Sequence, residues 1–317
     1  MLIRDGVKLT AAACLCEAAA DLNTQRVTSF HTTLLFALHY YFLLDSRYEH
    51  LFNITLRLCV TYGLISESLQ KFVQLHPDKE TQEFLSTSID KSSWVWTQLW
   101  YIIAKSFLKH FWTTTDINGW LGRGSMFVLS SAQARTLLSS ARSGRASVVR
   151  PSTIVDIGAG DGEVSRRYAN LFDTKYATEI SASMRKVLSN KGFTVFDPID
   201  EQQFSCVCMM NLVDRCVRPR TMLQQAHDAL SPDGLLLLAL VLPYKPYVEV
   251  TSDHKPEERL PISGSTFEEQ ASSFIHFMRD LGWELCSWSR VPYLCEGDFA
   301  QAYYWLDDSV YVFRPIR

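Results

Sequence analysis

The sequence lacks a basic excess. Its 31 Lys and Arg residues stand against 34 Asp and Glu residues, which leaves a formal net charge of −3, and no Lys/Arg run or internal repeat occurs. A protein that binds nucleic acid neutralises phosphates with surplus cations. The composition therefore argues against nucleic acid as a partner. With 47% hydrophobic and 21% charged residues, it is typical of a globular protein.

The sequence also lacks a metal-binding or disulfide pattern. Its eight cysteines are Cys14, Cys16, Cys59, Cys206, Cys208, Cys216, Cys286 and Cys295. The Cys-x-Cys pairs have no second ligand pair at zinc spacing. Two of the cysteines fall in an apolar run that predicts a central strand, where a free thiol packs as a small hydrophobe. We expect reduced thiols and no metal site.

The N-terminal 65 residues form an extension of open role. Residues 27–44 carry no charge, and their length is at the lower limit for a membrane span. Two His and two Thr within residues 30–44 weaken that interpretation, so a signal anchor or membrane-lying helix stands beside a buried or partner-facing helix. Location stays open between the cytoplasm and the endoplasmic reticulum. The sequence does not indicate an oligomeric state.

Residues 66–150 predict a helical region. Helical spacing occurs at 64–72 and 80–85, with a break at 76–78, and residues 92–112 form an aromatic helix. We expect most of these rings to pack against the catalytic domain. The alternative is a helix that lies on a membrane surface, which is weakened because Lys105 and Lys109 give only a small basic face. Glycines flank Arg123 within residues 117–127, which predicts either a flap over a ligand entrance or a plain linker. Ser130 is a candidate N-cap for a helix through residue 138.

Three glycines at alternate positions mark the next segment. Residues 152–163 read Ser-Thr-Ile-Val-Asp-Ile-Gly-Ala-Gly-Asp-Gly-Glu, and a helical pattern begins at Val164. Residues 153–156 predict a strand, so the glycines form a tight turn between strand and helix. Such a turn allows positive φ and exposes bare backbone to a ligand beside a helix N-terminus.

The glycine spacing separates two classes of cofactor. A dinucleotide fold has Gly-x-Gly-x-x-Gly facing a pyrophosphate, whereas here the third glycine comes one residue early. Asp156 and Asp161 place carboxylates in and beside the turn, which repel phosphate but suit a cationic ligand. The pattern resembles motif I of class I S-adenosylmethionine methyltransferases. This resemblance implies that Asp156, Gly158 and Gly160 contact S-adenosylmethionine.

The following segments predict alternating strands and helices. Residues 175–180 form a strand with Glu179 near its end, about where an acid partners a ribose diol. After a helix at 181–191 and a strand at 192–196, Asp197 either faces an adenine amino group or belongs to an ordinary turn. Residues 204–210 are apolar apart from Ser205, as expected of a central parallel strand. Asn211 and Asp214 follow it, where ligands bind at the carboxyl ends of parallel strands.

The remaining pattern completes the predicted fold. Helices at 219–230 and 266–281 surround a strand at 235–242, and strands at 283–291 and 308–313 form a terminal antiparallel pair. Residues 151–317 therefore predict a doubly wound, mostly parallel α/β domain of Rossmann-like type, preceded by the helical region and the N-terminal extension.

Several short segments together are similar to the DREV family of methyltransferase-like proteins. They are the glycine loop, Asn-Leu-Val-Asp-Arg-Cys at 211–216, Leu-Val-Leu-Pro-Tyr at 240–244, Pro-Tyr-Leu-Cys-Glu-Gly-Asp at 292–298, Tyr-Tyr-Trp-Leu-Asp-Asp at 303–308 and Leu-Gly-Arg-Gly-Ser-Met-Phe at 121–127. The similarity covers about residues 66–317. It implies transfer of methyl from S-adenosylmethionine to the pros nitrogen of histidine in protein substrates with His-x-His segments.

The same resemblance implies residue roles. Glu179, Asn211 and Tyr293 match cofactor contacts, while Asp214 and Tyr304 match contacts to the substrate histidine. For Asp214 the alternative is an ion pair with Arg215 or a cap on the next helix. Two other functions stay open, namely a small-molecule methyltransferase on the same fold and a non-catalytic protein that uses the fold as an interaction surface.

Overall fold

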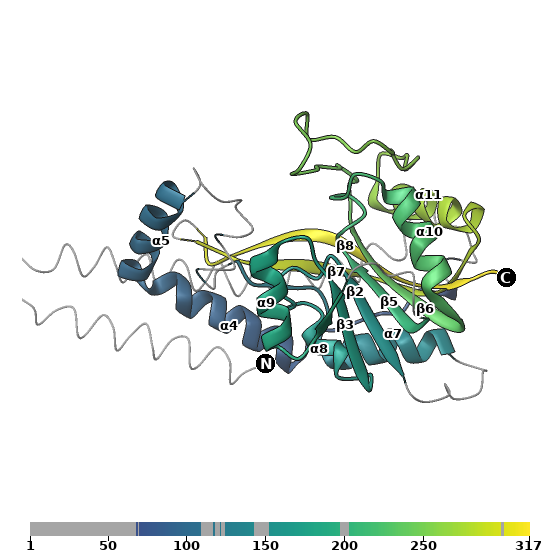
Figure 1. Ribbon diagram of the computed structural model, residues 1–317, viewed down its shortest axis with the longest axis horizontal. Coiled ribbons are helices and arrows are strands. Elements are labelled where there is room, and N and C mark those ends of the chain that lie inside the picture. The colour runs from purple at the N-terminus through teal and green to yellow at the C-terminus, as the bar shows by residue number, and fades with distance from the viewer. Residues whose placement is uncertain are drawn as a thin grey trace, which may run out of the picture. The chain divides into compact units, whose positions relative to one another are not determined.

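The chain divides into two compact units, Met1–Ile54 and Thr55–Arg317. The computed structural model describes residues 68–317 except 69, 109–116, 118–120, 122–123, 143–151, 197–202 and 299–300, all within the second unit (Figure 1). The predictions for residues 27–44, Arg123 and Asp197 lie outside the described residues. In the described part no helix combines the length and hydropathy needed to cross a membrane.

One sheet of eight strands organises the described residues (Figure 1). The strands are β1 (Met126–Phe127), β2 (Thr153–Ile157), β3 (Thr174–Thr178), β4 (Thr194–Val195), β5 (Phe204–Met210), β6 (Leu230–Val241), β7 (Trp283–Glu296) and β8 (Tyr303–Pro315). Their order is β1-β7-β8-β6-β5-β2-β3-β4. Strands β2 to β6 pair in parallel, and β8 pairs antiparallel with both β6 and β7. The predicted doubly wound, mostly parallel sheet is confirmed.

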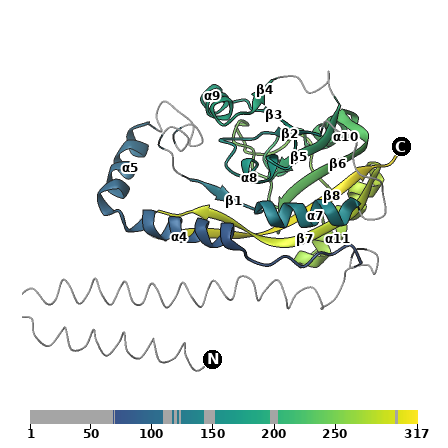
Figure 2. The ribbon, with the colours of Figure 1, turned by 90° about the horizontal axis from the view of Figure 1, so that it is seen from below.

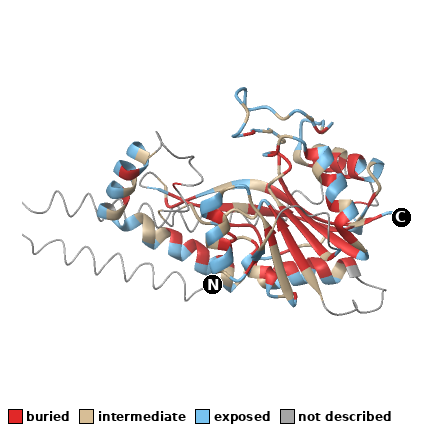
Figure 3. Cartoon of the chain, in the orientation of Figure 1, coloured by how far each residue is buried: buried red, intermediate tan, exposed pale blue. Residues whose placement is uncertain are grey.

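Seven helices lie over their full length within the described residues. They are α4 (Lys79–Ser93), α5 (Val95–Leu108), α7 (Ser131–Arg142), α8 (Arg166–Ala169), α9 (Ala182–Asn190), α10 (Pro219–Ala229) and α11 (Phe267–Asp280). One core joins α10 and α11 to a face of the sheet, and a second core joins α7, α8 and α9 to the other face. Residues of β5 alternate between the cores, with Val207 in the first and Cys208 in the second. Burial on both faces explains why this strand is almost entirely apolar (Figure 3).

Three strands are longer than the sequence predicts. Strand β6 begins at Leu230 and not at residue 235, so the Pro-Asp-Gly segment at 232–234 lies inside the strand, where the β5–β6 register shifts. Strands β7 and β8 pair from Trp283–Pro315 to Glu296–Tyr303. The pairing of β8 with β6 ends at Val241 and Asp308. Beyond that point, within the described residues, β7 and β8 pair only with each other along most of their remaining length. Backbone pairing between the two strands sustains a ribbon that hydrophobic periodicity alone does not reveal.

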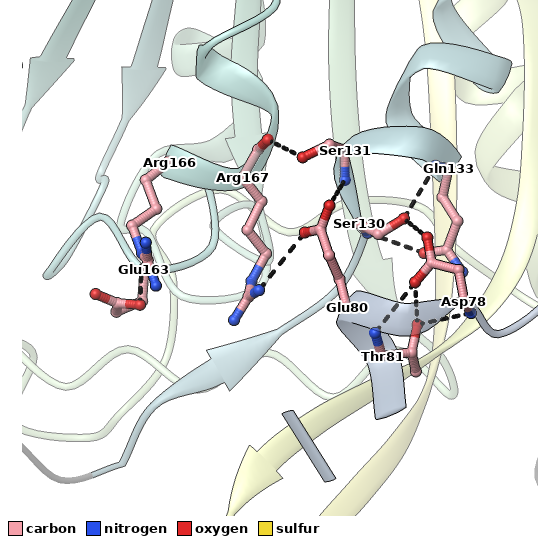
Figure 4. A network of polar contacts seen from close by, with 9 residues as sticks. All are labelled: Asp78, Glu80, Thr81, Ser130, Ser131, Gln133, Glu163, Arg166 and Arg167. Carbon is pink, nitrogen blue, oxygen red and sulfur yellow. Dashed lines mark hydrogen bonds and ion pairs between the residues drawn. The ribbon is translucent and has the colours of Figure 1, made fainter. Parts of the chain in front are cut away.

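The predicted break at residues 76–78 is confirmed because Asp78 caps α4. The Thr81 N–H donates to Asp78 Oδ1 at 3.1 Å, and the Asp78 N–H is close to Thr81 Oγ1 at 3.4 Å. Ser130 begins α7 as predicted, since its hydroxyl accepts the Gln133 N–H at 3.1 Å. The Ser130 hydroxyl also donates to Asp78 Oδ2 (Figure 4). The two helix starts are therefore joined by one polar network.

The same network reaches the helix that follows the glycine loop. The Ser131 N–H donates to Glu80 at 3.2 Å, and Glu80 lies 3.6 Å from an Arg167 guanidinium nitrogen (Figure 4). The Arg167 guanidinium also lies over the Phe127 ring, 4.8 Å from its centroid. Helix α4 and strand β1 thus both contact α8, so this part of the helical region supports the catalytic domain.

The prediction for the aromatic helix is wrong in its bounds and mostly wrong in its packing. Helix α4 ends at Ser93, and α5 starts a separate helix at Val95. The side chains of Trp96 and Trp100 are 83% and 58% exposed, whereas Gln98 is buried. Aromatic composition suggested burial, but the orientation of α5 turns a polar side chain inward and its large rings outward.

Candidate active site

The three glycines of the loop after β2 have different roles. Gly158, Gly160 and Gly162 have φ values of 66°, 56° and 73°, a region that favours glycine. A Cβ on Gly158 would lie 2.8 Å from Leu212, and one on Gly162 would lie 2.7 Å from Leu188. A Cβ on Gly160 would meet nothing within 4 Å. The outer glycines therefore permit close packing, while the middle one leaves open space for a ligand.

The acids beside this loop have basic partners. Lys191 Nζ lies 2.6 Å from Glu163 Oε1, donates to the Asp161 carbonyl at 2.7 Å and lies 3.9 Å from Asp161 Oδ2. Arg166 Nε binds the other Glu163 oxygen at 2.7 Å. The charge of Asp161 is thus partly offset within the protein. The expectation that Asp161 directs a cation into the turn is weakened by this partner.

Glu179 joins the glycine loop to the start of α9. It follows β3, where its Oε2 accepts the Gly160 N–H at 2.8 Å and its Oε1 accepts the Ser181 N–H at 2.9 Å. Glu179 is therefore not a strand-end carboxylate held only by solvent. A carboxylate offers about four lone-pair sites, so both oxygens keep acceptor capacity for a ligand with hydroxyl donors.

Asp156 is a buried acid below the loop. It lies near the end of β2 and is 4% exposed. Burial raises its pKa to about 7, the Glu179 carboxylate adds to this rise, and the Ser165 hydroxyl opposes it. Asp156 is therefore partly protonated near neutral pH. The sequence argument that treated it as a full negative charge facing the ligand needs this correction.

Asn211 follows β5 in a left-handed conformation. Its φ is 54°, which is uncommon outside glycine and often marks a functional site. The backbone N–H donates to the Ala239 carbonyl at 3.0 Å, and Nδ2 donates to Asp308 Oδ2 at 2.8 Å. Its Oδ1 is buried and has no hydrogen-bond partner among the described residues. The amide is thus held by its nitrogen, and its oxygen remains an unused acceptor.

Asp308 accepts the hydrogen bond from this amide, and the sequence did not predict it as a site residue. It lies on β8 between Val241 and Val291 of the neighbouring strands and is fully buried. Burial raises its pKa to about 8, the bond from Asn211 opposes this rise, and Asp214 adds to it. Its Oδ1 lacks a partner in the described part of the chain. The available sequence signal was an acid at the start of the predicted strand 308–313, before the apolar run Val310–Phe313.

Asp214 presents a third buried oxygen. Its Oδ2 lies 3.2 Å from Arg215 Nε, and the side chains of Asp214 and Arg215 are 4% and 50% exposed. The ion pair considered from sequence therefore exists, but it occupies one oxygen. The Oδ1 has no hydrogen-bond partner within the described residues. Burial raises the pKa of Asp214, and the Arg215 charge opposes this rise.

Two tyrosines extend the site along the β7–β8 ribbon. Residues Tyr304, Leu306 and Asp308 alternate along β8 and so share one face, and Tyr293 of β7 pairs with Leu306. Burial raises the pKa of Tyr293, with Asp308 and Asp214 among the charges that add to the rise. Tyr304 is partly exposed, and its hydroxyl donates to Asp298 at 3.0 Å. Tyr293 therefore lies near the acids, and Tyr304 lies farther out.

These features define a ligand site at the carboxyl edge of the parallel strands. The chain reverses its strand order between β2 and β5, and such a switch point is where doubly wound sheets bind ligands. Buried polar atoms are nearly always bonded, yet single oxygens of Asn211, Asp214 and Asp308 have no partner in the described structure. With the open Gly160 and the acceptor Glu179, these atoms suit a ligand with hydroxyl, amino and cationic groups. The fold and site are those of a class I S-adenosylmethionine-dependent methyltransferase.

The family comparison agrees with this class. The chain belongs to the DREV methyltransferase family, whose model matches residues 58–315. S-adenosylmethionine is accordingly its methyl donor, and the resemblance noted from the short segments is confirmed.

Solved methyltransferase structures also match the chain. A DhpI complex with S-adenosylhomocysteine is 14% identical, with a TM-score of 0.38, over 73% of this chain and 97% of that chain. The N-methyltransferase NodS from Bradyrhizobium japonicum, also with S-adenosylhomocysteine, is 12% identical, with a TM-score of 0.36, over 59% and 87%. The ribosomal protein L11 methylase from Lactobacillus delbrueckii subsp. bulgaricus is 11% identical, with a TM-score of 0.36, over 60% and 82%.

Proposed function

We propose that this protein is a protein-histidine N-methyltransferase that forms pros-methylhistidine in His-x-His segments of protein substrates. The similarity of its short segments to the DREV family supports this substrate class. The observation that carries the chemistry is the buried Asp214 carboxylate, which has one oxygen paired with Arg215 and one without a partner in the described chain.

The donor is held by the glycine loop and by two acceptors. Gly160 offers open space beside the backbone, Glu179 accepts from the ribose hydroxyls, and the Asn211 carbonyl oxygen accepts from a donor group of the cofactor. Tyr293, which pairs with Leu306 on the face of the ribbon that carries Asp308, completes this set. When bound, S-adenosylmethionine supplies an electrophilic methyl group carried by a sulfonium.

Asp214 selects the reactive form of the substrate. A neutral imidazole has one nitrogen with a free lone pair, and its other nitrogen carries the proton. The unpaired Asp214 oxygen accepts the N–H of the tele nitrogen, which leaves the pros nitrogen as the nucleophile. After methylation the ring is cationic, so the same carboxylate stabilises the charge and accepts the surplus proton. Its raised pKa makes it a stronger proton acceptor than an exposed aspartate.

The ribbon supplies a surface for an extended peptide. Tyr304, Leu306 and Asp308 share one face of β8, and this face runs from the exposed Tyr304 to the buried acids. A substrate chain along this face brings a histidine from solvent to Asp214. Tyr304 then contacts the imidazole and fixes the plane of the ring.

The direct test is methyl transfer to a peptide that contains Ala-His-Ala-His. With labelled S-adenosylmethionine, we expect pros-methylhistidine, identified by chromatography of the hydrolysed peptide against both histidine isomers. A peptide with Ala-Lys-Ala-Lys and one with Ala-Arg-Ala-Arg serve as matched controls and should remain unlabelled. Label in either control with none in the histidine peptide would refute the proposed substrate class.

A further inference from the structure

Helix α5 presents its largest apolar side chains to solvent. Trp96, Leu99, Trp100, Ile103 and Phe107 follow the spacing i, i+3, i+4, i+7 and i+11, which places them on one face of a helix. They are 83%, 46%, 58%, 56% and 68% exposed. We call these five residues the α5 stripe. The buried residues Gln98 and Ala104 lie on other sides of the helix.

Contacts at the base of α5 fix this orientation. The Gln98 side-chain amide donates to the Lys91 carbonyl at 3.0 Å, which turns the Gln98 side of the helix inward. The Lys91 ammonium in turn lies 3.1 Å from Glu296 at the end of β7. Helix α5 is therefore held to the catalytic domain by polar contacts, and it lies at the opposite end of this domain from α10 and α11 (Figure 2).

The α5 stripe differs from most other exposed apolar residues. Ile102 on another side of α5 and Trp94 just before α5 are exposed as well, at 52% and 55%. Ile180, Val250 and Ile316 are also exposed, but each lies in a different loop or end, and isolated exposed apolar residues are normal. A contiguous row of five large side chains on one helix face is what marks an interaction surface.

Charge and residue type identify the partner. No Asp or Glu occurs from residue 91 to residue 115, whereas Lys105 and Lys109 do, in a chain whose net charge is −3. Lys91 is not counted here, because its ammonium is already paired with Glu296. Tryptophan combines an apolar body with an N–H donor and is enriched at membrane interfaces. A stripe with two Trp, flanked by Lys and without acids, matches the boundary between acyl chains and anionic headgroups.

The length of α5 places it on a bilayer and not across one. Its 14 residues span about 21 Å at roughly 1.5 Å per residue, which is shorter than a hydrocarbon core of about 30 Å. We propose that the α5 stripe docks this protein onto the surface of an anionic lipid bilayer. The proposal is independent of the substrate class proposed above.

The test is flotation of the full-length protein with vesicles of phosphatidylcholine alone or with 30% phosphatidylserine, about the content of an anionic leaflet. We expect binding to the anionic vesicles, with a blue shift of tryptophan fluorescence, and weaker binding to the neutral ones. The double variant Trp96→Ser/Trp100→Ser should lower the partition coefficient by about a hundredfold or more, because burial of each such side chain is worth at least about a factor of ten. Its activity on the soluble peptide should be unchanged.

The matched control is Val250→Ser/Ile316→Ser, which also removes two exposed apolar side chains and should float as the wild type does. Equal flotation of the tryptophan variant and the wild type would overturn the proposal and leave residues 27–44 as the lipid-binding segment. Absence of wild-type binding to anionic vesicles would also overturn it. So would a wild-type dimer, measured by light scattering without lipid, that the tryptophan variant abolishes, because the stripe would then bind a second copy.

Discussion

The two halves of the site differ in how far the protein satisfies their polar groups. Around the glycine loop, Glu179 already accepts two backbone N–H groups and Lys191 offsets the neighbouring acids. Around the end of β5, oxygens of Asn211, Asp214 and Asp308 are buried and lack a partner among the described residues. We infer that the first half is a preformed cradle for the donor. The second half is completed by its ligands, which is where transfer is expected to depend on individual atoms.

The largest expected effect comes from filling the cradle. Gly160→Arg places a long cationic side chain in the one open glycine position, where it displaces and repels the sulfonium donor. We expect no measurable binding of S-adenosylhomocysteine or S-adenosylmethionine in calorimetry. Gly282→Arg is the control, because Gly282 also has positive φ, at 83°, and its nearest neighbour lies 3.9 Å away, outside the site. Wild-type donor affinity in Gly160→Arg would mean that the donor lies elsewhere.

A smaller effect is expected when an acceptor of the cradle is removed. Glu179→Ala should weaken donor binding by roughly 1.5 to 3 kcal/mol, the range for hydrogen bonds to a charged group, and raise the donor KM. Glu179→Gln, which keeps one acceptor oxygen, should have a donor KM between those of Glu179→Ala and the wild type. If the donor KM of Glu179→Ala stays unchanged, Glu179 serves only to hold Gly160 and Ser181.

The second half of the site is tested through Asp308. Asp308→Leu leaves the Asn211 Nδ2 buried without an acceptor, which costs roughly 1 to 3 kcal/mol and lets the amide turn. Donor affinity, measured by calorimetry on protein shown to be folded by circular dichroism, should fall accordingly. Asp308→Asn keeps an oxygen for the same bond and should bind almost as the wild type does. Equal loss in both variants would show that the bond to Asn211 is not what matters.

The last expected effect is a change of slope in the pH dependence of stability. The pKa of Asp308 is raised from 3.8 to about 8 on folding, so between these values the folded state binds a proton that the unfolded state releases. Its contribution therefore lowers the free energy of unfolding as pH rises from about 4 to 8, by up to a few kcal/mol. Urea unfolding at pH 5 and pH 8 should show a shallower decrease in Asp308→Asn. The decrease that remains is expected from Asp156, whose raised pKa acts in the same direction. Equal slopes would contradict the burial of an acid at position 308.

Local signals predicted the glycine loop, and Asn211 and Asp214 after β5, but they did not predict Asp308. The apolar strand at 204–210 and the glycine loop were recognised because neighbouring residues carry their pattern, and β5 has the bounds that the sequence indicates. Asp308 pairs with Asn211 across 97 residues, and no periodicity connects two such positions. The tertiary packing of β8 beside β6 brings them together.

The same limit explains the error at α5. A run of aromatic residues indicates an apolar helix face, but it does not show whether that face turns toward the rest of the protein. The orientation of α5 depends on Gln98 and Lys91, whose contacts join α5 to α4 and the end of β7. Composition therefore predicted a helix correctly, but the prediction that its apolar face packs against the catalytic domain was wrong.

The most direct test of the division between the two halves is Asp214→Ala, with donor binding and methyl transfer measured on one preparation. We expect S-adenosylhomocysteine to bind as in wild type, while pros-methylation of the Ala-His-Ala-His peptide falls by roughly a hundredfold or more, as for loss of a positioned acid/base group. Arg215→Ala, which removes the ion-pair partner but keeps the carboxylate, should retain most of the transfer. Wild-type turnover in Asp214→Ala, or a tele-methylhistidine product from the wild type, would contradict the role assigned to Asp214.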